Sequence, residues 1–142
     1  MKKKYKIGYT TGVFDLFHVG HLEILEKAKE QCDYLVVGVS TDDLVQSYKH
    51  KKPVIPYEDR ARIVSSIKCV DKVVPQTTLD KSVAWNEIKF DVLFHGDDWN
   101  KTSVYNENES KLIPLGVEFV YFPYTGGVSS TIIREKCKSQ EK

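Results

Sequence analysis

The sequence has few cysteines and no long apolar run, and both absences narrow its class. Its three cysteines, Cys32, Cys69 and Cys137, are odd in number and widely spaced among 142 residues. This pattern argues against a disulfide framework or a zinc site and is typical of a reducing compartment. Three lysines follow Met1, but no apolar segment after them is long enough for a signal peptide or a membrane span. We therefore expect a cytoplasmic protein without a membrane partner.

An excess of one charge is also missing. The 21 basic and 20 acidic residues give a formal net charge of +1. Nothing in this balance indicates a nucleic-acid partner. No internal repeat or Gly/Ser/Pro-rich linker divides the chain, and its length suffices to bury one core. We therefore expect a single domain spanning residues 1–142.

Apolar runs of strand length alternate with helical patterns along the whole chain. Strands are expected at 6–11, 34–40, 70–74, 91–94 and 117–122, and helices at 22–32, 44–47, 56–67, 80–89, 107–115 and 129–137. This alternation indicates a parallel sheet with right-handed crossovers. The predicted fold is α/β, a Rossmann-like doubly wound parallel sheet of about five strands with helices on both faces. In such sheets ligands bind beyond the carboxyl ends of the strands.

Two histidines stand at the turn between the first strand and the first helix. His18 and His21 are three residues apart, which places them on one face of the first helical turn. Unpaired backbone N–H groups at a helix start favour anions, and two imidazole donors beside them predict a phosphate site. Gly20 would let a phosphate approach the backbone. A single histidine here would more often be a cap or a core residue, but two favour the phosphate site.

A second candidate phosphate site precedes the last helix. Ser129, Ser130 and Thr131 follow two glycines at the start of that helix. One hydroxyl at such a position is usually a plain helix cap. Three in succession after two glycines favour a cradle for a phosphate group.

Several stretches resemble motifs of a known enzyme family. Residues 12–21, Gly-Val-Phe-Asp-Leu-Phe-His-Val-Gly-His, resemble the H-x-G-H signature of the nucleotidyltransferase superfamily. Residues 124–131, Tyr-Thr-Gly-Gly-Val-Ser-Ser-Thr, resemble the R-T-E-G-I-S-T-T signature of cytidylyltransferases, and residues 96–99 match the G-D-D-W of enzymes that act on glycerol 3-phosphate. Residues 40–42 and 57–60 fit as well. The chain is thus most similar to the glycerol-3-phosphate branch of the cytidylyltransferase family.

The resemblance implies transfer of CMP from CTP to a small alcohol phosphate, for which glycerol phosphate is the first candidate. The acceptor would attack directly and in line, and pyrophosphate would be released. It implies Mg²⁺ as cofactor, no dedicated metal-ligating side chains, and a homodimer. His18 and His21 are the candidate catalytic residues. The residues expected to bind CTP are Thr11, Gly12, Val13, Phe14, Gly20, Gly96, Asp97, Trp99, Val128, Ser129, Ser130 and Thr131. Those expected to bind the acceptor are Asp42, Lys49, Lys51, Lys52, Arg60 and Tyr124.

The chain also departs from the family pattern. Tyr124 replaces an arginine, Gly126 a glutamate and Val13 a threonine. Losing the arginine removes a bidentate phosphate clamp. Either Arg60, Arg134 or the lysines at 49–52 compensate, or CTP or the acceptor is bound differently.

Two residues near these motifs are not expected to bind substrate. Asp15 is expected to brace its turn rather than perform chemistry. His95, just before G-D-D-W, is expected to make no ligand contact.

Two other functions are compatible with these motifs. One is adenylyl transfer, for example to a sugar phosphate, on the same fold. The other is a nucleotide-binding module without turnover, for which the changes at Tyr124 and Gly126 would mark a degenerate site. The acceptor is also open, because ethanolamine phosphate, choline phosphate or another polyol phosphate would fit the same motifs.

Overall fold

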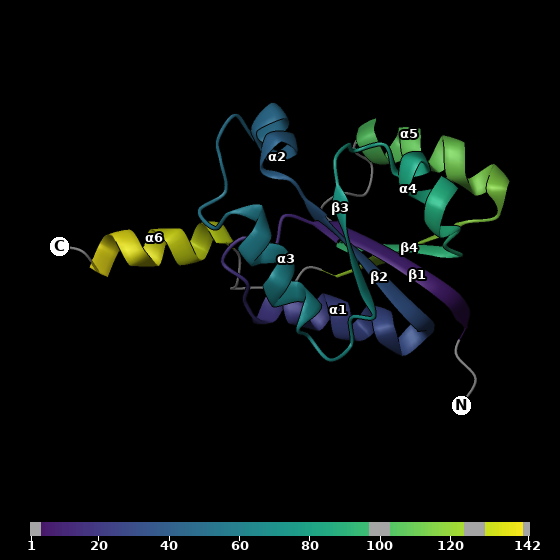
Figure 1. Cartoon of the computed structure of the whole chain (residues 1–142), viewed down its shortest axis with the longest axis horizontal. Helices are drawn as coiled ribbons and strands as arrows, with labels where there is room; N and C mark the ends of the chain where they lie inside the picture. The colour runs from purple at the N-terminus through teal and green to yellow at the C-terminus, as the bar shows by residue number, and fades with distance from the viewer. Residues whose placement is uncertain (1–3, 97–102, 124–129, 141–142) are drawn as a thin grey trace.

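The computed structural model describes residues 4–96, 103–123 and 130–140 (Figure 1). Five strands alternate with the helices. In chain order the elements are β1 (Tyr5–Gly12), α1 (Val19–Gln31), β2 (Cys32–Ser40), α2 (Asp42–Lys49), α3 (Tyr57–Ser65), β3 (Lys72–Gln76), α4 (Lys81–Ile88), β4 (Val92–Gly96), α5 (Ser103–Leu112), a 3₁₀ turn η2 (Ile113–Leu115), β5 (Glu118–Phe122) and α6 (Ser130–Gln140).

The strands form one parallel sheet in the order β3-β2-β1-β4-β5. The order runs backwards from β1 to β3 and then continues from β1 to β4 and β5. This reversal between β1 and β4 is the switch point of a doubly wound fold, and it confirms the predicted fold class. The turns that follow β1 and β4 meet at this point.

Helices cover both faces of the sheet, as predicted (Figure 1). On one face, Leu25 and Ala28 of α1 and Val64 of α3 join a buried cluster with Val37 and Phe94 of the sheet. On the other face, Leu112 of α5 packs with Tyr9, Val36 and Leu93, and apolar residues of α4 lie against them. The alternation of side chains along each strand produces these two cores.

The main differences from the predicted boundaries concern β3 and α5. The strand expected at 70–74 lies two residues later, because Val70 ends the turn after α3 by donating its N–H to Ile67. Pro75 is accommodated because β3 is an edge strand. The helix expected at 107–115 begins at Ser103 and ends in the 3₁₀ turn that holds Pro114. Among the helices described, none is long and apolar enough to cross a bilayer.

Candidate active site

The β1–α1 turn is held by a reciprocal pair of histidine caps. His18 is the N-cap of α1, and its Nδ1 accepts the N–H of Gly20 at 3.0 Å. In return, Nδ1 of His21 accepts the N–H of His18 at 3.2 Å. This is a capping box in which two imidazoles take the places of the usual hydroxyl and carboxylate. Both histidines therefore cap the helix, and each does so through one nitrogen only.

The caps also fix which ring nitrogen carries a proton. In neutral imidazole one nitrogen accepts and the other donates, so an accepting Nδ1 leaves the proton on Nε2. The His18 and His21 rings stack with their centroids 3.9 Å apart and their planes at 25°. Burial lowers the pKa of His18, while burial and the neighbouring His18 together lower the pKa of His21 to about 4. Near pH 7 the pair thus offers two neutral Nε2–H donors side by side.

Aromatic packing and an unusual backbone fix the turn before these rings. The Phe14 and Phe17 rings lie 5.4 and 5.2 Å from the His21 ring. Phe14 and Leu16 have positive φ angles of 55° and 51°, a conformation that L-residues adopt at a cost. The buried Phe14 side chain, 6% exposed, keeps this backbone in place. The shape of this turn is therefore held by the packing of its own aromatic residues.

Gly20 lies between the two histidines and takes part in the cap. It is buried, and its N–H already donates to His18 Nδ1. A phosphate that approaches the backbone here would not receive this N–H, and the expected contact of Gly20 with CTP stays a prediction. Phe14 lies in the core and the carbonyl of Val13 accepts from Arg60. Neither the Phe14 side chain nor that carbonyl is directed to a nucleotide.

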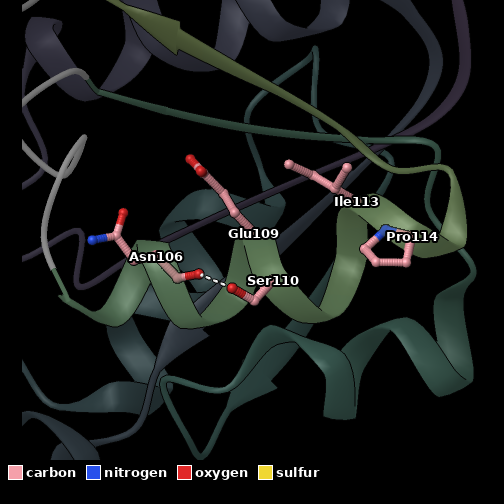
Figure 2. Close-up of a pocket in the computed structure, with 5 residues that line it drawn as sticks. All are labelled: Asn106, Glu109, Ser110, Ile113 and Pro114. Atoms are coloured by element: carbon pink, nitrogen blue, oxygen red, sulfur yellow. Dashed lines mark hydrogen bonds between the residues drawn. The ribbon is translucent and has the colours of Figure 1, made fainter.

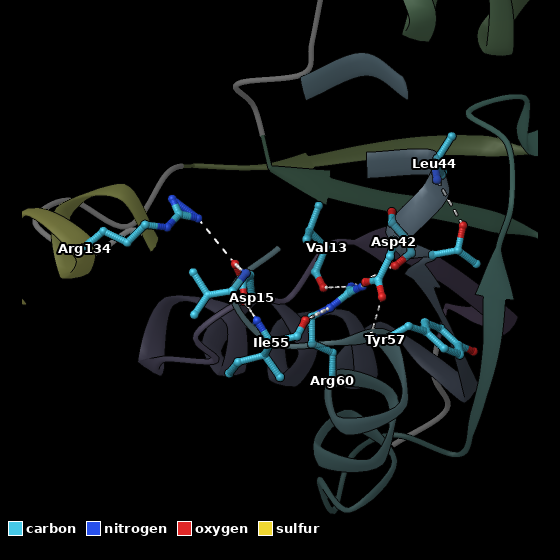
Figure 3. A network of polar contacts seen from close by, with 11 residues as sticks. Val13, Asp15, Asp42, Leu44, Ile55, Tyr57, Arg60 and Arg134 are labelled. Atoms are coloured by element: carbon cyan, nitrogen blue, oxygen red, sulfur yellow. Dashed lines mark hydrogen bonds and ion pairs between the residues drawn. The ribbon is translucent and has the colours of Figure 1, made fainter. Parts of the chain in front are cut away.

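Asp15 anchors a distant loop to this turn (Figure 3). Its carboxylate is 3% exposed and accepts the N–H groups of Val54 at 2.8 Å and Ile55 at 2.9 Å. Arg134 of α6 approaches the same carboxylate at 3.5 Å. The bracing role expected of Asp15 is confirmed, and it extends well beyond its own turn.

Arg60 lies under the site and joins four segments (Figure 3). Its guanidinium is 0% exposed and donates to the carbonyl of Ile55 at 2.7 Å, of Val13 at 2.7 Å and of Ser40 at 2.8 Å. The fourth partner is the Asp42 carboxylate at 2.6 Å. A fully enclosed guanidinium with these partners cannot receive an acceptor phosphate. The acceptor role expected for Arg60, and its use in place of the family arginine, are therefore corrected.

The remaining acceptor candidates lie on α2 and on the loop that follows it. The Asp42 side chain is 37% exposed, although Arg60 and the N–H of Tyr57 hold its two oxygens. Lys49, Lys51 and Lys52 are exposed. The same loop is held by Asp15 at Val54 and Ile55. Lys49 thus ends α2, and Lys51 and Lys52 lie on a loop that is tied to the turn of the histidines.

Several expected site residues lie at or beyond the ends of the described segments. Asp97, Trp99, Tyr124, Val128 and Ser129 lie outside the described residues, and Ser130 and Thr131 are described only as the first backbone turn of α6. Gly96, the last residue of β4, is buried, and Thr11 near the end of β1 is 4% exposed. Gly12 ends β1.

The other face of the same edge holds His95 and two polar residues, Lys81 and Gln76, that the sequence analysis did not single out. Burial lowers the pKa of His95 to about 3, and a neighbouring Lys81 contributes. Lys81 itself is 3% exposed, and burial lowers its pKa to about 8. Gln76, the last residue of β3, is 6% exposed. The sequence offered a signal for two of them. Gln76 is a polar residue at the end of a strand, and Lys81 directly follows the helix cap Asp80.

A shallow groove of about 490 Å³ lies on α5, on the sheet face opposite α1 (Figure 2). It is lined by Asn106, Glu109, Ser110, Ile113 and Pro114. None of the expected site residues is among them. The groove is therefore not part of the site at the histidines.

Comparisons with known proteins agree with this geometry. A cytidylyltransferase-like family model matches residues 9–136. The chain belongs to the cytidylyltransferase-like family. A glycerol-3-phosphate cytidylyltransferase of Bacillus subtilis is 38% identical over 89% of this chain and 93% of its own, and one of Staphylococcus aureus is 37% identical over 89% and 91%.

Solved structures show the same fold. A lipopolysaccharide core biosynthesis protein of Thermoplasma volcanium superposes with a TM-score of 0.72 at 30% identity, covering 85% of this chain and 97% of its own. The pantothenate synthetase of Thermus thermophilus, at 14% identity, has a TM-score of 0.65 and covers 96% of this chain and 65% of its own. At that identity the likeness concerns the fold alone.

Proposed function

We propose that this nucleotidyltransferase transfers CMP from CTP to a small alcohol phosphate, glycerol phosphate first among them, and releases pyrophosphate. The His18/His21 pair carries the proposal, because its two Nε2–H donors lie at the switch point of the sheet. The relatives named for glycerol 3-phosphate support this choice of acceptor.

The reaction needs positioning and charge stabilisation rather than a protein nucleophile. A phosphate oxygen of the acceptor attacks the α-phosphorus of CTP in line, the bond to the β-phosphate oxygen breaks, and pyrophosphate leaves. Negative charge grows on the oxygens around the α-phosphorus and on the leaving group. Neutral donors held by the backbone stabilise this charge without having to reorient. His18 and His21 supply them, and the hydroxyls of Ser129, Ser130 and Thr131 are proposed to hold the outer phosphates.

CTP is proposed to bind as its Mg²⁺ complex. Within the described part of the chain, no group of three or more His, Cys, Asp or Glu residues could hold a metal ion. Phosphate oxygens are common Mg²⁺ ligands in nucleotide sites. The nucleotide would therefore bring the ion, whose charge would offset that of the phosphates.

The acceptor is proposed to approach from the side of β2. Lys49, Lys51 and Lys52 would attract its phosphate, and Asp15 holds their loop next to the β1–α1 turn. Asp97 and Trp99 are proposed to lie around the cytosine and ribose, and Tyr124 near the acceptor. A homodimer is proposed on the basis of the family resemblance, and light scattering of the purified protein tests it.

The direct test measures pyrophosphate release with CTP or ATP against glycerol, ethanolamine and choline phosphates. The expected result is turnover with CTP and an alcohol phosphate, and formation of the matching CDP-alcohol. A preference for ATP would move the protein to adenylyl transfer. Binding of CTP without pyrophosphate release from any acceptor would indicate a nucleotide-binding module.

A further inference from the structure

The face of the sheet edge opposite α1 carries a row of polar side chains. In a strand, residues separated by an even number of positions point to the same face. Gln76 of β3 lies two residues after Val74, and Ser40 of β2 lies four residues after Val36. Both therefore point to the face packed by α4 and α5. The strand register pairs Ser40 directly with Gln76. The carboxyl ends of β2 and β3 thus present two adjacent polar groups above the second core.

The Gln76 amide is bound at one end only. Its Nε2 donates to Ser40 Oγ at 3.0 Å, and the Tyr48 hydroxyl of α2 hydrogen-bonds the same serine. Its Oε1 has no hydrogen-bond partner among the described residues, although the residue is 6% exposed. An acceptor buried without a donor destabilises a protein, and such groups are rare unless a ligand or a water completes them.

We infer that Gln76 Oε1 accepts a hydrogen bond from a hydroxyl group of the acceptor alcohol, so that Gln76, Ser40 and Tyr48 form a subsite for a neutral polyol. This inference rests on the proposed function, which requires an alcohol phosphate at this edge. It adds which chemical group of the acceptor is recognised and by which residue.

The position of Gln76 suits this role. Its strand is two places from β1, and two strand spacings are roughly 10 Å. The phosphate of the acceptor must lie near the histidines after β1, so the other end of a small alcohol phosphate extends along the edge toward β3. The order of the strands therefore places the alcohol end, and not the phosphate, at Gln76.

The surroundings favour a neutral ligand over a cationic one. Gln76, Ser40 and Tyr48 are uncharged donors and acceptors, which suit hydroxyl groups. None of the three carries a carboxylate that would pair with the ammonium of an ethanolamine or choline headgroup. The subsite thus favours polyol phosphates over amino-alcohol phosphates.

The test pairs a substitution with a change in the substrate. Gln76→Leu removes the acceptor oxygen while keeping a similar volume, and Gln31→Leu at the end of α1 is the matched control. Each protein is assayed with CTP and with glycerol phosphate, 2-hydroxypropyl phosphate, 3-hydroxypropyl phosphate and ethanolamine phosphate. Melting temperature is measured in parallel, so that loss of folding is separated from loss of recognition.

In the unchanged protein, at least one of the two deoxy analogues should have a kcat/KM about tenfold or more below that of glycerol phosphate, because it leaves Oε1 unpaired. Gln76→Leu should raise the KM for glycerol phosphate roughly three- to tenfold and remove most of this discrimination. Its melting temperature should change little, because the unpaired acceptor and the hydrogen bond from Nε2 to Ser40 are removed together. Gln31→Leu should behave as the unchanged protein.

Three outcomes would overturn the inference. Equal losses with glycerol phosphate and with both deoxy analogues, or discrimination that persists in Gln76→Leu, would show that the amide is structural or holds only a water. Better use of ethanolamine phosphate than of glycerol phosphate would exclude a polyol subsite. Inactivity of the unchanged protein with every acceptor would overturn the proposed function itself, and the inference with it.

Discussion

Arg60 and the His18/His21 pair both suggest a phosphate ligand when the sequence alone is considered, yet the structure uses them differently. Every nitrogen of the Arg60 guanidinium has a protein partner, and the side chain is fully enclosed. Each histidine uses Nδ1 for the backbone and retains a donor at Nε2. The first group holds loops together, and the second has capacity left for a ligand. Whether a polar residue can bind a ligand or only positions other residues therefore depends on the donors it has left, more than on its residue type.

The largest loss of stability is expected from replacing Arg60, which binds four partners from different segments. Arg60→Met leaves three carbonyls and the Asp42 carboxylate without their buried donor. A buried acceptor left without its donor costs about 1–3 kcal/mol, and three carbonyls lose theirs, so the free energy of unfolding should fall by roughly 3–5 kcal/mol. Urea denaturation measures this, with Arg62→Met, exposed on the same helix, as control. A loss of acceptor affinity with unchanged stability would instead restore the ligand role.

The histidines should show the opposite behaviour. His18→Ala and His21→Ala should each reduce kcat by roughly 10²–10³, because a donor aimed at developing charge is removed. Loss of a helix cap should lower stability by only about 1 kcal/mol. Steady-state kinetics and calorimetric titration of CTP measure the two effects, with exposed His50→Ala as control. Weaker CTP binding at an intact kcat would contradict the proposed role.

Asp15, like Arg60, holds segments of the chain together, and replacing it tests whether it acts through the position of the loop. Asp15→Asn turns one acceptor oxygen into a donor that faces a backbone N–H of Val54 or Ile55. A hydrogen bond to a charged group contributes about 1.5–3 kcal/mol, so the free energy of unfolding should fall by an amount of this order. The lysine loop should also lose its anchor, which raises the KM for the acceptor phosphate. Asp43→Asn, exposed on α2, is the control. An unchanged free energy of unfolding together with an unchanged KM would show that Asp15 does not hold the loop in place.

The sequence predicted the fold well because apolar residues in a regular pattern have one main role, which is to be buried in the core. Alternating apolar runs predicted the sheet and both helical layers, and the H-x-G-H turn predicted where the site lies. The functions of polar residues were harder to predict, because they depend on contacts between distant segments. The Arg60 guanidinium donates to carbonyls of residues 13, 40 and 55 and pairs with Asp42, and most of these partners lie far from α3 in the sequence. Gln76 was overlooked because its environment comes from β2 and α2 rather than from its own strand.

The pH dependence of stability provides the smallest and most selective test of the comparison. Burial lowers the pKa of His21 from 6.5 to about 4 and the pKa of His95 from 6.5 to about 3, so the unfolded chain binds more protons than the folded chain between these values. Stability should therefore be complete above about pH 6.5 and should fall as the pH is lowered toward 4. Arg60 keeps its charge throughout this range and adds no slope. Urea denaturation at several pH values should show a weaker decline in His21→Gln than in the unchanged protein, with His50→Gln as control. An identical decline in His21→Gln would mean that folding does not lower the pKa of His21, and would contradict a buried imidazole that is kept neutral.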